Sequence, residues 1–318
     1  MPRVAAIDCG TNSIRLLVAD SVADAGPATR LSDVHREMRI VRLGQGVDAT
    51  GVLDPAAIER TRQALADYTA ILRDAGAERV RMVATSATRD AANREDFFGM
   101  VRETLGTDAE VISGDTEARL SFTGAVGDLS AADGPFVVVD VGGGSTELVV
   151  GSLGPDGEVE IHAARSVDVG CVRLTERCLR SDPPTEVERK EAGVVAREIL
   201  AEAFEHVPVA DANTWVGVAG TVTTLSAVAM DLPEYDPERI HLSRLPIPEL
   251  HRVADQLLTR SRDQRMEFGS MHPGRVDVIG GGALIVALLA DELARRAGIT
   301  ELVVSEHDIL DGIALSVL

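Results

Sequence analysis

The stretch VVVDVGGGSTELVVG, residues 137–151, is an apolar run that ends in Asp140, continues through three glycines to Ser145, and then becomes apolar again. Near the N-terminus, AAIDCGTNSIRLLV (residues 5–18) repeats this arrangement after Asp8. Both copies fit Asp-x-Gly-x-x-Ser. Two apolar runs joined by a short glycine-containing segment are typical of two strands and a hairpin. The chain therefore carries the same predicted hairpin twice.

The segments around the two copies follow a similar order. In the first third, the patterns predict strands at 4–8, 13–20 and 33–43, a helix at 55–74, a strand at 79–84, a helix at 93–105, a strand at 110–112 and a helix at 117–126. This is a βββαβαβα order. The second part begins again with strands at 136–141, 146–153 and 158–166, and then helices at 171–179 and 186–206.

The rest of the second part alternates in the same way. The patterns predict a strand at 214–218, a buried helix at 219–230, a glycine-opened helix at 277–295, a strand at 301–305 and a helix at 309–318. We infer an internal duplication and an α/β protein of two domains, residues 1–128 and 129–318, with a boundary near residues 127–134. The last helix, about 308–318, could pack back on the first domain.

Composition limits the classes of function. A chain of 318 residues, 45% of them hydrophobic, can fill two cores. No apolar run reaches ~18 residues, and the first residues lead directly into a strand, so we expect a cytoplasmic protein. The net charge of −20 argues against binding to nucleic acid or to an anionic membrane. A small anionic ligand stays compatible, because the local field of a pocket can oppose the net charge.

The cysteines, the single lysine and the hairpin sequences exclude several further classes of protein and binding site. Three scattered cysteines form neither a disulfide framework nor a CxxC metal site. The only lysine, Lys190, is not part of a Gly-Lys-Ser/Thr sequence, so no P-loop is present. Neither hairpin fits GxGxxG, and a strand follows each of them in place of a helix, which argues against a dinucleotide-binding fold.

The two hairpins have the composition of phosphate-binding loops. Small residues at a hairpin tip allow backbone N–H groups to point at a phosphate. An aspartate at the end of a strand can reach a hydrated Mg²⁺ held by that phosphate. A single copy could equally be only a tight hairpin. Two copies at matching places favour a phosphate clamp at a cleft between the two domains.

Two further glycine sites lie at predicted helix starts. Gly220 and Thr221 follow a strand, and Gly280–Gly282 open a later helix. A helix N-terminus with a bare glycine backbone suits an anion. Close helix packing is the competing interpretation, and we prefer it for Gly280–Gly282. For Gly220 and Thr221 both interpretations stay open.

Six motifs together resemble the exopolyphosphatase/guanosine pentaphosphate phosphohydrolase family. They are AAIDCGTNSIRLLV, VATSATRDAANRE, VISGDTEARLSFTGAV, VVVDVGGGSTEL, GVAGTVTTL and RVDVIGGGALI, and they follow the order of that family over essentially the whole chain. The resemblance implies the fold of the actin-like ATPase superfamily, in which two ribonuclease-H-like domains enclose the active-site cleft. It also implies Mg²⁺-dependent removal of the terminal phosphate from polyphosphate or from guanosine pentaphosphate.

The resemblance assigns the catalytic residues. Glu117 matches the glutamate that orients or deprotonates the attacking water, and Arg89 matches the arginine beside the substrate phosphates. Phosphoryl transfer needs an aligned water and positive charge on the equatorial oxygens, which a carboxylate and a guanidinium can supply. The competing interpretation of Glu117 is a surface acid that, like Asp115, stabilises the first turn of a helix.

The resemblance also assigns the binding residues. The metal is Mg²⁺, with Mn²⁺ as the alternative, and its neighbours would be Asp8, Asp140 and Glu147. Arg15 follows Ser13 by two positions and Glu147 follows Ser145 by two, so each pair shares one strand face. A solvated outer face is the alternative for Arg15. The expected phosphate-binding residues are Gly10, Thr11, Asn12, Ser13, Arg15, Gly142, Gly143, Gly144, Ser145, Gly220 and Thr221.

These expectations combine into a Mg²⁺-dependent exopolyphosphatase whose substrate brings the two domains together. Guanosine pentaphosphate hydrolysis is the nearest alternative, since the same clamp serves both substrates. A small-molecule kinase of the same superfamily and a non-catalytic nucleotide sensor are more distant alternatives. A homodimer is the assembly that the resemblance suggests, and the oligomeric state stays open.

Overall fold

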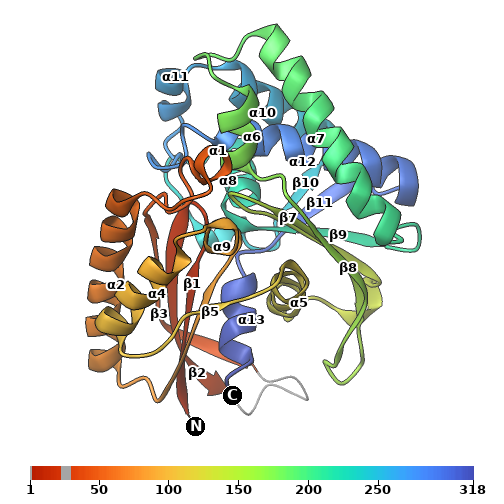
Figure 1. Ribbon diagram of the computed structural model, residues 1–318. Helices are drawn as coiled ribbons and strands as arrows, with labels where there is room; N and C mark the ends of the chain where they lie inside the picture. Colours follow the sequence, from red (N-terminus) through yellow and green to blue (C-terminus); the bar gives the residue numbers. More distant parts are fainter. Residues whose placement is uncertain (1, 23–29) are drawn as a thin grey trace. The chain divides into compact units, whose positions relative to one another are not determined.

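The computed structural model describes residues 2–22 and 30–318, and it divides into two compact units, each with one β-sheet (Figure 1). Unit 1 comprises Met1–Asp128, Gly154–Glu158 and Asp308–Leu318. Unit 2 comprises Leu129–Leu153 and Val159–His307. The chain thus leaves unit 1 twice, and it returns first for the short segment Gly154–Glu158 and then for its last helix.

Unit 1 is a five-stranded mixed sheet with helices on both faces. Its strand order is β3-β2-β1-β4-β5, in which β1, β2 and β3 are antiparallel neighbours and β4 and β5 continue parallel to β1. The strands are β1 Arg3–Cys9, β2 Ser13–Val22, β3 Arg30–Ile40, β4 Arg79–Ala84 and β5 Glu110–Val111. The helices are α1 Val47–Thr50, α2 Pro55–Ala75, α3 Ser86–Asp90, α4 Arg94–Leu105, α5 Gly114–Ala125 and α13 Ile309–Leu315.

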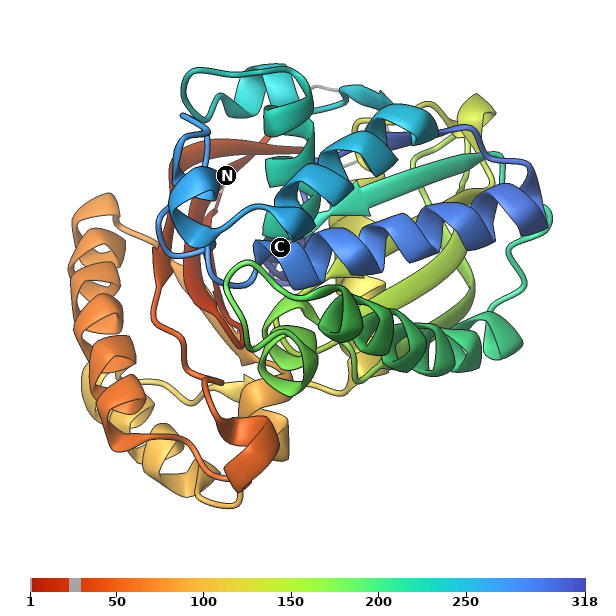
Figure 2. The same ribbon diagram turned by 90° about the horizontal axis from the view of Figure 1, so that it is seen from above.

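Alternation along β1 and β2 decides which helices cover which face of this sheet. One set of buried side chains, including Ile7 and Leu16, packs with α2 and α4, which lie next to each other (Figure 2). The alternate set, including Ala6 and Leu17, packs with α13. Successive side chains of a strand point to opposite faces, so a strand that is covered on both faces must be apolar throughout. Asp8 shares its face with Ala6 and therefore points toward α13.

Helix α13 is held close to α5 by two glycines. A Cβ on Gly124 would lie 1.8 Å from the carbonyl oxygen of Asp308, and a Cβ on Gly312 would lie 2.0 Å from that of Leu120. No larger residue fits at either position without moving the backbone. The close approach of the two helices explains why the last residues of the chain belong to unit 1.

Unit 2 repeats the central strand order and adds one strand. Its sheet runs β10-β11-β9-β6-β7-β8, so that β8-β7-β6-β9-β11 corresponds to β3-β2-β1-β4-β5 of unit 1. The strands are β6 Phe136–Val141, β7 Thr146–Leu153, β8 Val159–Val167, β9 Thr214–Val218, β10 Arg244–Pro246 and β11 Glu301–Val304. The helices are α6 Cys171–Cys178, α7 Glu186–His206, α8 Ala219–Ala229, α9 Pro237–Ile240, α10 Ile247–Thr259, α11 Arg262–Met266, α12 Ile279–Ala297 and the 3₁₀ helix η1 Ala131–Asp133.

The long helices α7, α10 and α12 form the main core of unit 2 against this sheet. Helices α7 and α12 lie side by side (Figure 2), and the buried Trp215 of β9 is part of the same hydrophobic cluster. The N-cap of α7 is a capping box, in which Thr185 and Glu188 bond to each other's backbone. Across the described ranges 2–22 and 30–318, we find no helix with the length and apolar character needed to cross a bilayer.

The fold class predicted from the sequence is confirmed. The chain is an α/β protein with two sheets, unit 1 follows the βββαβαβα order, and the duplication extends to the strand order of both sheets. The predicted bounds of helix 186–206 and strand 136–141 match the observed ones. Two elements begin three residues earlier than predicted. The third strand is Arg30–Ile40, and α5 starts at Gly114 because Ser113 caps it through its hydroxyl.

Candidate active site

The first hairpin, between β1 and β2, is a rigid loop held by its own carbonyl groups. The N–H of Gly10 donates to the carbonyl of Ser13 (2.9 Å), which closes the turn. The carbonyl of Thr11 accepts one N–H from the segment after β3 (2.8 Å), and that of Asn12 accepts two (3.0 and 2.9 Å). The hydroxyl of Thr11 lies 2.8 Å from that of Ser86 in α3. The loop is thus fixed from two sides.

The second hairpin, between β6 and β7, is held in the same manner by the first turn of α6. The N–H of Gly142 donates to the carbonyl of Ser145 (3.1 Å). The carbonyls of Gly142 and Gly143 accept backbone N–H groups from α6 (2.9 to 3.2 Å), and that of Gly144 accepts Nε of Arg173 (2.8 Å). Each carbonyl of the glycine run therefore has a donor from the same helix.

Both loops consequently present donors and not acceptors. Among the described residues, the N–H groups of Thr11, Asn12, Gly143 and Gly144 have no hydrogen-bond acceptor. A phosphate is repelled by carbonyl oxygens and attracted by N–H groups, so a loop with paired carbonyls and unpaired amides is suited to bind it. The structure thus gives each predicted phosphate-binding hairpin the backbone polarity that this role requires.

The structure brings together the two residues predicted to be catalytic. Glu117 is in the first turn of α5, but its side chain is buried, with 8% of the residue exposed. Its Oε2 accepts Nη1 of Arg89 (3.2 Å), and the same Nη1 donates to the carbonyl of Ile112 (2.8 Å). Asp115, two residues earlier, is exposed and pairs with Arg119. Asp115 therefore fits the description of a surface acid at a helix start, and Glu117 does not.

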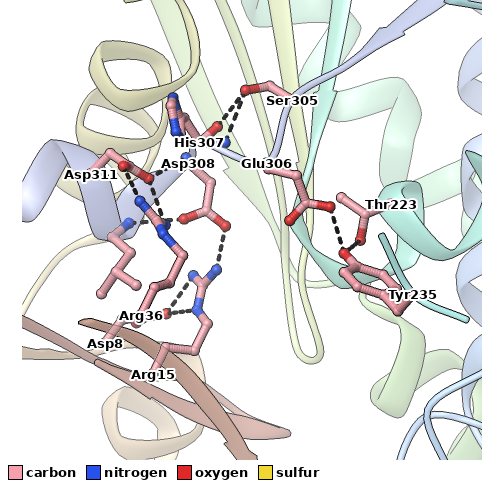
Figure 3. Close-up of polar contacts among 11 residues, drawn as sticks. Asp8, Arg15, Arg36, Thr223, Tyr235, Ser305, Glu306, His307, Asp308 and Asp311 are labelled. Carbon is pink, nitrogen blue, oxygen red and sulfur yellow. Dashed lines mark hydrogen bonds and ion pairs between the residues drawn. The ribbon is translucent and has the colours of Figure 1, made fainter. Parts of the chain in front are cut away.

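Arg15 and Asp8 form an ion pair that extends to α13 (Figure 3). The two residues are register partners on β2 and β1, and the Nη2 and Nε atoms of Arg15 lie 2.6 and 3.0 Å from Oδ2 of Asp8. Nη1 of Arg15 bonds to Asp308, the N-cap residue of α13. Burial raises the pKa of the Asp8 carboxyl, and Arg15 offsets part of that rise. A phosphate would have to compete with two carboxylates for Arg15.

In unit 2, the strand position that corresponds to Arg15 carries an acid, Glu147. Asp140 and Glu147 are register partners on β6 and β7, and both are buried, with 6% and 1% of the residue exposed. The hydroxyl of Ser166 donates to Oε1 of Glu147 (2.7 Å). Two facing carboxylates disfavour each other's charge unless a cation lies near them. Oxygen donors of this kind fit Mg²⁺ or Mn²⁺.

Asp8 fits a metal less directly than this pair. Its Oδ2 is bound to Arg15, while its Oδ1 is buried and has no hydrogen-bond partner within the described residues. One carboxylate oxygen of Asp8 could therefore accept a cation or a hydrated one. Arg15 already supplies part of the positive charge near Asp8. Asp140 and Glu147 would receive positive charge from a metal.

Gly220 and Thr221 begin α8 at a strained junction. Ala219 has a positive φ of 68°, a conformation that costs a non-glycine residue about 1 kcal/mol or more. A Cβ on Gly220 would lie 2.5 Å from the guanidinium carbon of Arg275, so this glycine leaves space for that side chain. Nη1 of Arg275 also reaches the hydroxyl of Thr224 (3.3 Å). Sequence reasoning did not single out Arg275, although this arginine is the first residue of the motif RVDVIGGGALI.

The later glycine run packs closely, as the preferred interpretation held. A Cβ on Gly282 would lie 2.6 Å from the methyl group of Thr221, and one on Gly281 would lie 2.5 Å from the hydroxyl of Thr175. Helix α12 thus approaches α8 and α6 at these glycines. The run lies next to the predicted phosphate-binding Thr221 and also borders a separate pocket that is described below.

The chain is similar to known proteins over nearly its whole length. The sequence profile of the Ppx/GppA phosphatase family matches residues 17–317. Exopolyphosphatase 2 of Mycobacterium tuberculosis is 59% identical over 322 residues, which cover 99% of this chain and 98% of that protein. A guanosine-5'-triphosphate,3'-diphosphate pyrophosphatase of Aeromonas salmonicida is 31% identical over 92% of this chain, which spans only 55% of that protein. The crystal structure of an exopolyphosphatase-like protein has a TM-score of 0.94 and 41% identity, covering 99% of this chain and 97% of that one. The chain belongs to the Ppx/GppA phosphatase family.

Proposed function

We propose that this protein is an exopolyphosphatase, which releases orthophosphate from the ends of inorganic polyphosphate by Mg²⁺-dependent hydrolysis. The observation that carries the proposal is the identity of 59% with an exopolyphosphatase over nearly the full length of both chains. The geometry of the two hairpins supports it, because each offers unpaired backbone amides to a phosphate. The proposal assigns both hairpins to the same substrate.

Each part of the site has one task in this proposal. Glu117 accepts a proton of the attacking water and orients its oxygen toward the terminal phosphorus. Arg89, which bonds to Glu117 at 3.2 Å, keeps that carboxylate in place and can share its remaining N–H groups with a phosphate oxygen. The amides of the two hairpins hold the phosphates of the chain.

The metal would be held by Asp140 and Glu147, with Asp8 as an additional neighbour. When it is bound, Mg²⁺ neutralises charge on the phosphate oxygens and so favours attack by water. A net charge of −20 makes that neutralisation more important, because a polyphosphate that approaches the protein is repelled. The same donor set accepts Mn²⁺ as an alternative.

Hydrolysis of guanosine pentaphosphate is the second candidate. Its support is the likeness to a guanosine-5'-triphosphate,3'-diphosphate pyrophosphatase at 31% identity. The hairpins bind phosphates and not a base, so the same site suits both substrates. A panel of short and long polyphosphate, guanosine pentaphosphate and ATP at one Mg²⁺ concentration separates the candidates by their kcat/KM values. A cytoplasmic location and a homodimer stay predictions of the same proposal.

The direct test compares two acids of one helical turn. Glu117→Gln keeps the shape of the side chain but removes the charge that aligns the water, so we expect phosphate release from polyphosphate to fall about 10²–10⁴-fold. Asp115→Asn is the matched control, because Asp115 is exposed and bonds only to Arg119 at 2.8 Å. Its activity should stay within a factor of about two. Full activity of Glu117→Gln would refute the role of Glu117.

A further inference from the structure

A pocket of about 260 Å³ lies within unit 2, apart from the two hairpins. It is formed by the end of α6, the loop that follows it, α11 and the first turn of α12. Its lining residues are Thr175, Leu179, Arg180, Ser181, Asp182, Pro184, Arg262, Arg265, Asp277, Gly280 and Gly281. None of these residues has a task in the proposed hydrolysis.

Arg265 is a buried cation at the wall of this pocket. Only 4% of the residue is exposed, yet no carboxylate of the described chain lies within 4.0 Å of its guanidinium. Its Nε donates to the carbonyl of Leu257 (2.7 Å) and its Nη1 to that of Val276 (3.0 Å). Burial lowers the pKa of Arg265, and the charges of Asp182 and Asp277 offset only part of that lowering. An anion in the pocket would provide the missing compensation.

A second polar group of the pocket also lacks a partner. The hydroxyl oxygen of Thr175 is buried and has no hydrogen-bond partner within the described residues. It lies beside the first turn of α12, where the N–H groups of Gly280 and Gly281 have no acceptor inside the helix. These glycines leave the space open, since a Cβ on Gly280 would be 3.1 Å from Nη2 of Arg265. A guanidinium, a hydroxyl and a helix N-terminus thus face one cavity.

The two aspartates of the pocket do not neutralise the positive charge of its arginines. Asp277 pairs with Nε of Arg262 at 2.7 Å, and Asp182 accepts the backbone N–H of Arg262 at 2.8 Å. Arg180 is a further cation at the wall, with no carboxylate of the described chain within ion-pair distance. Three arginines and two aspartates therefore give the pocket a positive balance in a strongly acidic protein. A local balance of this sign attracts anions.

We propose that this pocket is a second phosphate-binding site, in which Arg265, Thr175 and the first turn of α12 bind one phosphate group. Tetrahedral oxyanions accept hydrogen bonds from guanidinium, hydroxyl and helix N-terminal donors together. The site lies one helical turn along α6 from the residues that hold the glycine loop, because Thr175 follows Cys171 by four positions. Its ligand is orthophosphate from solution or a phosphate group of a longer chain.

The test follows backbone amide resonances of the full-length ¹⁵N-labelled protein without Mg²⁺. Orthophosphate is titrated first, and the resonances of Gly280 and Gly281 should shift to saturation. Thr175→Val removes only an unpartnered hydroxyl, so the protein should stay folded while the apparent Kd rises about tenfold. Arg180→Gln should also raise the Kd. Arg252→Gln is the control of equal charge, because this exposed arginine of α10 pairs with Glu249 and does not line the pocket.

Two further arms identify the source and chemistry of the ligand. Saturation by orthophosphate assigns the site to free phosphate, whereas saturation by tripolyphosphate alone assigns it to a group of a chain. Either result supports the proposal if Thr175→Val weakens the binding of that ligand. Equal binding of acetate, no saturable shift, or equal affinity of Thr175→Val and the unaltered protein would overturn it. Because the readout needs no turnover, failure here is distinct from failure of the proposed hydrolysis.

Discussion

The two hairpins share a backbone design but differ at one facing position. Asp8 of β1 pairs in register with Arg15, whereas Asp140 of β6 pairs in register with Glu147. Both aspartates are buried at the ends of equivalent strands. In unit 1 the protein supplies the cation itself and connects it to α13 through Asp308. In unit 2 the partner is a second acid.

The two copies of the loop have therefore kept the same backbone hydrogen bonding but differ in the charge of the side chain that faces the aspartate. Both copies retain paired carbonyls and unpaired amides, which is the part needed to bind phosphate. The residue that faces the aspartate differs between the two loops: it is an arginine in unit 1 and a second acid in unit 2, where the proposed function places a metal ion. We therefore expect that a change to the charged pair of the first hairpin mainly lowers the stability of the fold. A change to the acidic pair of the second hairpin should mainly weaken the binding of Mg²⁺.

The largest expected effect is on stability, from Arg15→Gln. This change leaves two buried carboxylates, Asp8 and Asp308, without their shared cation, and breaking a buried pair costs about 3 kcal/mol or more. Urea unfolding measures the loss. Arg3→Gln is the matched control, since Arg3 and Asp20 are register partners on the same two strands but are far more exposed. It should cost less than about 1 kcal/mol. Equal losses would contradict the comparison.

The loss caused by Arg15→Gln should depend on pH. Burial already raises the pKa of Asp8 in the folded protein, and removal of Arg15 raises it further. Asp8 of the folded variant then binds a proton more tightly than Asp8 of the unfolded chain, so the contribution of this group to stability is fully present at acid pH and is lost as pH rises through its raised pKa. The stability difference from the unaltered protein should shrink as pH is lowered from 7 to about 5. A difference independent of pH would argue against charged carboxylates as its cause.

The next effect is on activity, from Glu147→Gln. The change removes one of two facing acids, so Mg²⁺ should bind more weakly and kcat/KM should fall about 100-fold at limiting Mg²⁺. Excess Mg²⁺ should restore part of the activity. The unfolding midpoint should not decrease, because two buried like charges become one. Unchanged dependence on Mg²⁺ would show that the metal is held elsewhere.

The smallest effect comes from the glycines that support each loop. A Cβ on Gly170 would lie 2.5 Å from the carbonyl carbon of Gly143, so Gly170→Ala must move the backbone of the second loop. A Cβ on Gly44 would meet mainly side chains, those of Thr11 and Ala87. We expect about a tenfold loss of kcat/KM for Gly170→Ala and a smaller loss for Gly44→Ala. The reverse order would mean that the first loop is the more rigid one.

Sequence reasoning predicted the elements because their patterns are local. The apolar runs of β1 and β2 and the glycine turn between them each lie within a few neighbouring residues. It missed the short helix α3, and it missed the helix α10 although the buried residues of α10 have regular helical spacing. Spacing alone could not separate Glu117 from Asp115, because both occupy the first turn of one helix and only packing buries one of them. The resemblance to the family is what singled out Glu117.

The duplicated hairpin, the order of strands and helices and the acids at the strand ends could all be predicted before the structure, since they depend on spacing along the chain. The hydrogen-bond and ion-pair partners of these groups depend on tertiary structure. Asp308 reaches Arg15 across 293 positions, and the first turn of α6 takes up the carbonyls of the glycine loop. Arg265 becomes a buried cation only after α11 packs beside α12. Spacing fixes which groups a strand offers, but the charge facing them depends on contacts between segments far apart in the chain.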